Sequence, residues 1–219
     1  MIFKNYPEIV LTHSNSSAGN MSFSKGDPKI ALANRKAFLK KNNLSLDQIV
    51  KLYVKHGSKV VSVGKKDLGK GAFDLESGIK SDALITNQAN VFLMLPSADC
   101  MPIAIFDPKN KIISLIHGSK KSLEKGIIEN TISKISKKFK STPSNLIIHI
   151  GPSIGPCCYY LNIWSDAIQR LKRTGVLEKN IENSKVCTYH ENVYFSHSKS
   201  FNQKLKNDFR FITILGMKK

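Results

Sequence analysis

The chain lacks several features that would place it in a specialised class of protein. No apolar stretch approaches the roughly 20 residues that a helix needs to cross a bilayer. Four cysteines in 219 residues are too few for a disulfide scaffold. The segment 1–8 has no apolar core followed by a small-residue cleavage site, so we expect no signal peptide. These absences favour a cytoplasmic protein with free thiols and no membrane partner.

Arginine is scarce although the chain is strongly basic. The formal net charge is +18, and it comes from 30 lysines but only four arginines, which are scattered along the whole sequence. Readers of bases and phosphates usually rely on the planar fork of arginine, and no basic motif interleaved with aromatic residues is present. We therefore expect no nucleic-acid partner, and we interpret the charge mainly as a lysine bias in composition.

The remaining composition is that of an ordinary globular protein. Hydrophobic residues make up 41% and charged residues 23% of the chain. There are no repeats and no credible interdomain linker, so we expect one mixed α/β (α+β) domain over residues 1–219. Apolar runs typical of strands lie at 9–12, 51–56, 58–63, 83–86, 91–95, 102–106, 111–116, 146–150 and 211–215.

Three helices are predicted between these strands. One begins at Asp27-Pro28, with Asp27 as N-cap and an apolar face through Ile30, Ala33, Ala37 and Phe38. A second runs from Ser122 to about Phe139, and a third covers 162–173. The runs 51–56 and 58–63 are expected to join in a tight turn at Gly57, the glycine-rich segment 64–80 is expected to be a loop, and Cys187 is expected on a short strand.

Two histidines and one cysteine fall where strand-like runs end in turns. His56 and His117 are each followed by glycine, and Cys100 lies in the turn after 91–95. Imidazole nitrogen and thiolate sulfur are preferred zinc ligands, and three protein ligands leave a position free for water or substrate. The intervals of 44 and 17 residues match no local metal motif, so Cys100 also remains a candidate buried apolar residue or nucleophile. The other histidines, His13, His149, His190 and His197, are interpreted as structural or surface residues.

Several segments together resemble a known family, the laccase-domain proteins, also called polyphenol oxidase-like or peptidoglycan-editing-factor proteins. The resemblance runs in order through most of the chain, and its most specific motifs are Ala-Asp-Cys-x-Pro and Gly-Pro-Ser-Ile-Gly-Pro-Cys-Cys-Tyr. The segments that carry it are Asn34-Arg35, His56-Gly57, 81–86, 98–102, His117, 151–159, Phe195-Ser196 and Arg210.

The resemblance implies a fold and a metal site. The fold is one of mixed β-sheets flanked by helices, shared with a bacterial deamidating toxin domain of the cytotoxic-necrotizing-factor type. The metal site is zinc held by His56, Cys100 and His117, with copper as the alternative metal. Characterised members look like purine nucleoside enzymes that phosphorolyse adenosine, inosine and methylthioadenosine and deaminate adenosine. Bacterial relatives are also linked to keeping the composition of peptidoglycan precursors correct.

The chain departs from the family pattern next to the expected ligands. Members usually continue the second histidine as His-Ala-Gly-Trp-Arg-Gly, whereas this chain has His117-Gly118-Ser119-Lys120-Lys121-Ser122. Lys121 keeps a positive charge but lacks the planar two-point grip of arginine. The usual glutamine before the first histidine is Val54, and the glutamate expected after Cys-Cys-Tyr is Tyr160.

Three hypotheses follow. The first is a zinc enzyme acting on purine nucleosides, with Cys100, His117 and Asp99 catalytic, Asp99 as proton carrier, and Arg35, Lys121 and Arg210 binding substrate or phosphate. The second is a metal-free amidohydrolase with Cys100 as nucleophile and His117 as its base. The third is a catalytically degenerate homologue with a basic binding surface. No sequence pattern indicates the oligomeric state.

Overall fold

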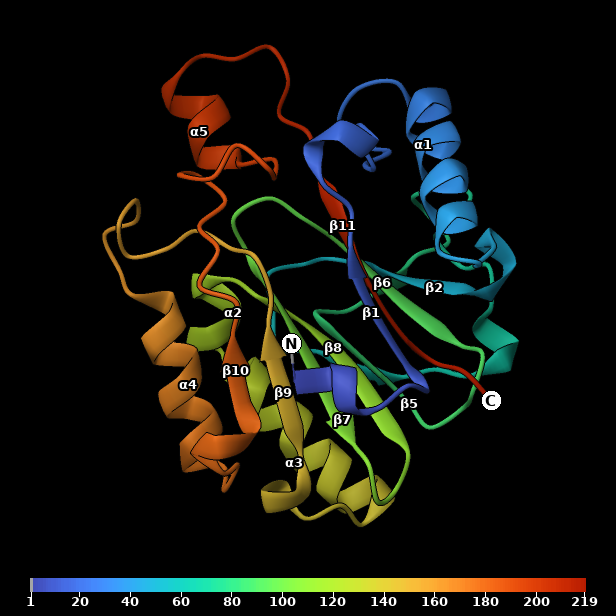
Figure 1. Ribbon diagram of the computed structural model, residues 1–219, viewed down its shortest axis with the longest axis vertical. Helices are drawn as coiled ribbons and strands as arrows, with labels where there is room; N and C mark the ends of the chain where they lie inside the picture. Colours follow the sequence, from blue (N-terminus) through green and yellow to red (C-terminus); the bar gives the residue numbers. More distant parts are fainter. Residues whose placement is uncertain (1) are drawn as a thin grey trace.

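The computed structural model describes residues 2–219 and has two β-sheets packed face to face, with helices on both outer faces (Figure 1). The five-stranded sheet has the order β1-β11-β6-β2-β4, and the six-stranded sheet has the order β10-β9-β7-β8-β5-β3. Helix α1 lies on one side of the molecule and α4 on the opposite side (Figure 1). The expected class, mixed β-sheets flanked by helices, is confirmed.

The strands are short and mostly buried on both faces. Their bounds are β1 Ile9–His13, β2 Ile49–Tyr53, β3 Val60–Ser62, β4 Ile79–Lys80, β5 Ala83–Thr86, β6 Phe92–Ser97, β7 Met101–Asp107, β8 Ile112–Gly118, β9 Ile147–Ile150, β10 Ile181–Asn183 and β11 Phe211–Met217. The helices are α1 Pro28–Lys41, α2 Lys120–Glu124, α3 Ile127–Phe139, α4 Ile163–Arg173 and α5 His197–Asn202. Among residues 2–219, no helix has the length and apolar character required to cross a membrane.

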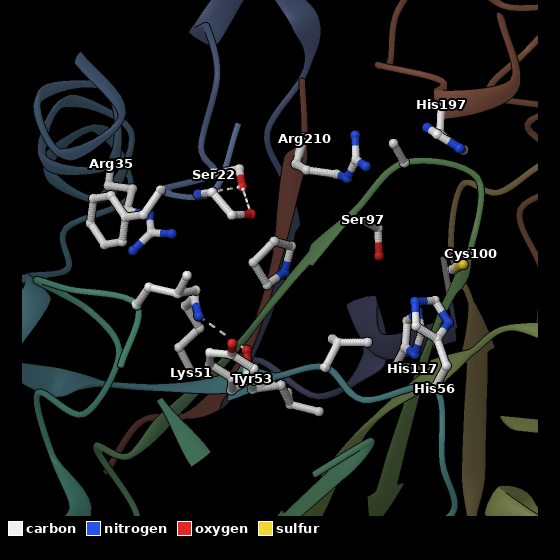
Figure 2. Close-up of a pocket in the computed structure, with 17 residues that line it drawn as sticks. Ser22, Arg35, Lys51, Tyr53, His56, Ser97, Cys100, His117, His197 and Arg210 are labelled. Carbon is white, nitrogen blue, oxygen red and sulfur yellow. Dashed lines mark hydrogen bonds between the residues drawn. The ribbon is translucent and has the colours of Figure 1, made fainter. Parts of the chain in front are cut away.

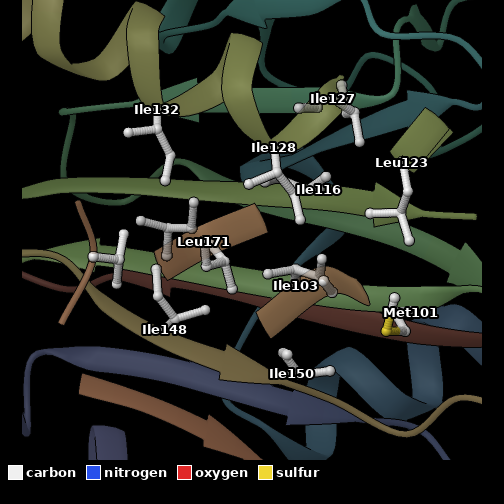
Figure 3. Close-up of a cluster of buried hydrophobic side chains, with 14 of the residues drawn as sticks. Met101, Ile103, Ile116, Leu123, Ile127, Ile128, Ile132, Ile148, Ile150 and Leu171 are labelled. Atoms are coloured by element: carbon white, nitrogen blue, oxygen red, sulfur yellow. The ribbon is translucent and has the colours of Figure 1, made fainter. Parts of the chain in front are cut away.

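Successive side chains of the central strands point to opposite faces of the sheet, and this builds a layered core. On β7, Ile103 and Ile105 face the helices α3 and α4, whereas Ala104 and Phe106 pack between the two sheets. Figure 3 shows isoleucines of α3 pointing down onto the sheet. Because both faces of β7 are covered, its run is continuously apolar instead of alternating, which is how the sequence presents it.

The pairing of β7 with β8 brings distant residues to one edge of the sheet. These antiparallel strands pair Met101 with Gly118 and Pro102 with His117. Cys100 directly precedes β7, so it lies beside the end of β8, where His117 is located. The register therefore places a thiol and an imidazole from two different strands next to each other.

The predicted turn at Gly57 is wrong in one respect. Strands β2 and β3 are not hairpin partners, because β2 pairs with β6 and β4 in one sheet and β3 pairs with β5 in the other. The chain crosses between sheets here, and the left-handed residue is His56, with φ 53°, instead of Gly57. Sequence periodicity cannot reveal which sheet a short strand joins.

Two helix predictions also need correction. The N-cap Asp27 is confirmed, since its side chain accepts from Lys29 N, but α1 buries Ala31, Arg35 and Leu39. The expected face is wrong because Ile30 is 58% exposed, whereas a charged residue is buried. The expected helix 122–139 is two helices, α2 and α3, separated at Gly126, which has a left-handed φ of 77°.

The other elements match or extend the expectations. Helix α4 begins after Asn162 as predicted, and the segment 64–80 is mainly a loop. Cys187 is not on a strand; it makes a single β-bridge with Ser153. His149 is buried in β9 and hydrogen-bonds Glu182, which confirms its structural role. The elements β10 and α5 were not predicted, since both are short and weakly patterned.

Candidate active site and metal centre

The three residues singled out at strand ends converge in space. The nearest ligand atoms of His56, Cys100 and His117 all lie within 4.8 Å of one another. The two imidazole rings meet edge to face, with centroids 4.8 Å apart. Figure 2 shows the three side chains together on one side of a cavity. His117 is 3% exposed, Cys100 is half-buried, and His56 lies at the rim.

One buried carboxylate holds both histidine segments. Asp82 precedes β5 and is fully buried. Its Oδ1 is 3.0 Å from Nδ1 of His117, and its Oδ2 accepts from the backbone N–H of Gly57 at 2.8 Å. Burial raises the pKa of Asp82, but its bonds to His117 and to Gly57 outweigh burial and lower it. An ionised carboxylate behind an imidazole fixes the tautomer that leaves Nε2 free for a metal, the usual arrangement around ligating histidines.

The pKa values of His117 and His56 are shifted in opposite directions. Burial lowers the pKa of His117, but its interactions with Cys100 and Asp82 overcome this and raise it to about 9. Burial and the positive charge of His117 lower the pKa of His56. His117 is therefore the more basic of the two histidines, whereas the lowered pKa of His56 favours its neutral form, which can bind a metal ion.

A cavity of about 410 Å³ lies beside this group, and two buried cationic side chains line its wall. Arg35 is 0% and Lys51 is 2% exposed, and both line the side of the cavity away from the histidines (Figure 2). Burial lowers the pKa of Arg35 to about 9, and burial together with Arg35 lowers that of Lys51 to about 8. None of the described residues that line this cavity is acidic. Two buried positive charges without a carboxylate in the wall favour an anionic ligand.

Arg35 combines structural and electrostatic roles. Its Nε donates to the Met21 carbonyl at 2.8 Å, and Nη1 donates to the carbonyls of Gly71 and Ala72. The Phe23 ring stacks on the guanidinium at 3.7 Å. Within residues 2–219, Nη2 is buried without a hydrogen-bond partner. The predicted substrate-binding residue therefore lies at the cavity, with one donor nitrogen unused.

The other predicted substrate residues lie on different sides of the histidines. Arg210 lines the same cavity as Arg35, but its guanidinium is paired with Asp208. Lys121 lines a second hollow of about 600 Å³ beyond His56 and Cys100, together with Lys55, Lys120, Lys125, Tyr159 and Tyr160. His56 and Cys100 thus border two basic cavities, and the expected phosphate-binding residues are divided between these cavities.

Asp99, the predicted proton carrier, lines neither cavity. Its Oδ1 accepts from Thr188 Oγ1 at 2.7 Å, and its Oδ2 accepts from the Ser198 N–H at 2.6 Å. Asp99 also has a left-handed φ of 79°. The carboxylate therefore ties the turn before Cys100 to the segment 188–198 and positions the thiol.

Sequence reasoning missed two residues of the site. Asp82 stood within a family-like segment but carried no assigned role, because its partner His117 is 35 residues away. Lys51 lies in an apolar strand run, and a charged residue within that run was the signal that the sequence offered.

Comparison with known proteins decides the family. The model of the family described as multi-copper polyphenol oxidoreductase laccase matches residues 11–163 and 159–207. The chain belongs to this family. The resemblance stated from the sequence motifs is confirmed.

Relatives within the laccase family carry the name purine nucleoside phosphorylase. The protein named purine nucleoside phosphorylase YlmD of Geobacillus stearothermophilus is 31% identical over 158 residues, covering 69% of this chain and 58% of that protein. YlmD of Bacillus subtilis is 36% identical over 105 residues, covering 48% of this chain and 38% of that protein. The matches therefore span less than two thirds of the length of these curated relatives.

Solved structures of the family share the fold along the whole chain. A Bacillus licheniformis hypothetical protein, YfiH, superposes with a TM-score of 0.93 at 22% identity and covers 98% of this chain and 95% of its own. YlmD from Geobacillus stearothermophilus gives 0.91 at 24% identity, covering 98% and 93%. The layered arrangement of two sheets is thus the family fold.

The donor set fits a thiophilic divalent metal. Two imidazoles, one thiol and a carboxylate behind one imidazole suit zinc with an open position, and a His₂Cys set also suits copper. His56, Cys100 and His117 are the residues that would hold the ion.

Proposed function

We propose that the chain is a zinc-dependent purine nucleoside phosphorylase acting on adenosine, inosine or methylthioadenosine. One observation carries the proposal: a single cavity is lined both by His56, Cys100 and His117 and by the buried cations Arg35 and Lys51. Relatives that carry the name purine nucleoside phosphorylase support the same substrate class.

In this reaction a phosphate oxygen forms a bond to C1′ of the ribose while the bond from C1′ to the purine nitrogen breaks. The electron pair of that bond leaves with the purine, which takes up a proton. Lys51 and Arg35 line the cavity and attract the phosphate through their positive charges. Asp82 keeps His117 in one orientation throughout. Zinc, when bound, supplies Lewis-acid stabilisation of developing negative charge.

The test is the dependence of purine release on phosphate. Purified protein loaded with zinc should convert inosine to hypoxanthine and a ribose phosphate only when inorganic phosphate is present. In Lys51→Met, a near-isosteric change, we expect the KM for phosphate to rise about 10- to 100-fold, the value of one charge-assisted hydrogen bond. Lys36→Met, on the exposed side of α1, is the matched control. Purine release that does not require phosphate would disprove the assignment.

A second candidate uses the same residues without a metal. Cys100, His117 and Asp82 form a thiol–imidazole–carboxylate series, in which the pKa of His117 is raised to about 9. Cysteine hydrolases use the same series, in which a carboxylate orients the imidazole base beside the thiol nucleophile. An amidohydrolase is therefore the alternative function. Rapid alkylation of Cys100 that neither zinc nor a chelator changes would favour it. Protection of Cys100 by zinc would favour the phosphorylase.

A further inference from the structure

A second group of sulfur and imidazole atoms lies where the loop after β9 meets the segment before α5. The ligand atoms of Cys157, Cys158 and His190 are all within 4.8 Å of one another, and the two sulfur atoms are 3.5 Å apart. The Cys187 thiol is near Cys157 and Cys158 but is not among the three mutually close ligand residues. Two thiols and one imidazole thus converge from two separate stretches of chain, with a third thiol close by.

Backbone contacts hold these two stretches together. The N–H of Ser153 donates to the Val186 carbonyl, and the N–H of Thr188 donates to the Ser153 carbonyl, both at 3.1 Å. The N–H of Gly155 donates to Cys187 Sγ at 3.2 Å, and a Cβ at Gly155 would come within 2.7 Å of the Trp164 ring. The turn that carries the paired cysteines is therefore packed closely against the segment that carries Cys187 and His190.

The spacing of the Cys157 and Cys158 sulfur atoms fits a tetrahedral thiophilic ion. With zinc–sulfur bonds of about 2.3 Å, two sulfurs of a tetrahedral site lie about 3.8 Å apart, so the observed 3.5 Å requires little movement. Three thiolates with one imidazole are a donor set of structural zinc sites, and soft sulfur ligands disfavour magnesium and calcium. We propose that Cys157, Cys158, Cys187 and His190 form a second, structural zinc site.

This site would stabilise a wall of the active site. Tyr159 and Tyr160 directly follow the paired cysteines and line the lysine-rich cavity beside His56 and Cys100. A zinc ion that joins residues 157–158 to residues 187–190 restricts the backbone immediately before these tyrosines. The site shares no ligand with the first group, and it does not rest on the proposed phosphorylase activity.

The experiment measures zinc content in a background that lacks the first site. Cys100→Ser removes a ligand of the first group, so zinc bound by this full-length variant reports on the second group. We expect about one zinc per chain in Cys100→Ser and a loss of that zinc when Cys157→Ser or His190→Gln is added. His197→Gln in the same background is the matched control, because His197 is also exposed but bonds Asp208. It should leave the zinc content unchanged.

Cobalt substitution identifies the ligands. Thiolate-to-cobalt charge-transfer absorption is expected in Cys100→Ser and should be lost on addition of Cys157→Ser. If a double variant misfolds, protection of Cys157 and Cys158 from alkylation by zinc in the wild-type chain answers the same question. A Cys100→Ser protein that binds no zinc, or a Cys100→Ser/Cys157→Ser protein that keeps it, would overturn the proposal, as would zinc that fails to protect the paired thiols.

Discussion

The two histidine–cysteine groups of this protein use the same kinds of donor atom in different surroundings. In the first, His117 is buried and Asp82 orients it. In the second, Cys157 and His190 are exposed, and across residues 2–219 no carboxylate hydrogen-bonds the His190 ring. The first group is already oriented by Asp82, which suits catalysis. The proposed second site would depend more on the ion itself, which suits a structural role.

Removing a ligand of the first group should have the largest effect. In Cys100→Ser we expect purine nucleoside phosphorolysis to fall roughly a thousandfold, because several kcal/mol of metal-based charge stabilisation would be lost. Steady-state rates with inosine and phosphate measure it. Activity within tenfold of wild type would remove this group from catalysis and end the proposed contrast between the two groups.

Loss of the orienting carboxylate should have the next largest effect. Asp82→Asn keeps the shape of the side chain but replaces an acceptor oxygen with a donor, so we expect zinc affinity at the first group to fall about 10- to 100-fold. Competition with a chromophoric chelator measures it. Asp107→Asn is the matched control, because Asp107 is equally buried and bonds Lys109 and Asn110 at the far end of β7. Equal losses in both variants would mean that Asp82 has no special role.

A variant of Asp99 distinguishes a positioning role from a role in proton transfer. We expect Asp99→Asn to lower the free energy of unfolding by about 1–3 kcal/mol, since one of the buried contacts to Thr188 or Ser198 is left unsatisfied. Chemical denaturation measures this change. The pH dependence of kcat should keep its shape, because Asp99 does not line the cavities. Loss of one limb of that profile would instead support the predicted role of Asp99 as proton carrier.

The folding stability of the protein at low pH limits the range over which either histidine–cysteine group can be studied. Burial and the charge of His149 lower the pKa of His13 from 6.5 to about 3. Between these pH values the unfolded chain binds a proton that the folded chain does not, so stability falls as the pH falls from 6.5 towards 3. The slope from this group is at most about 1.4 kcal/mol per pH unit. In His13→Gln, denaturation at several pH values should show a shallower decline, and an unchanged slope would contradict this assignment.

Much of the fold was predictable because hydrophobic periodicity and local signals determine it. The strand runs around β7, β8 and β9 and the N-cap Asp27 correspond to observed elements. The face of α1 was not predictable, because the burial of Arg35 depends on carbonyls of Met21, Gly71 and Ala72 that only tertiary packing brings near. The separation of β2 from β3 likewise depends on nonlocal strand pairing.

The sequence by itself determined which chemical groups the protein has at strand ends: His56, Cys100 and His117, each beside a turn. Tertiary structure alone decided that Asp82 bonds His117, that Asp99 bonds Thr188 and Ser198, and that Arg35 and Lys51 line one cavity. The physical reason is that ligand geometry, burial and charge compensation are set by contacts between segments far apart in the chain. Residue type and local spacing do not encode those contacts.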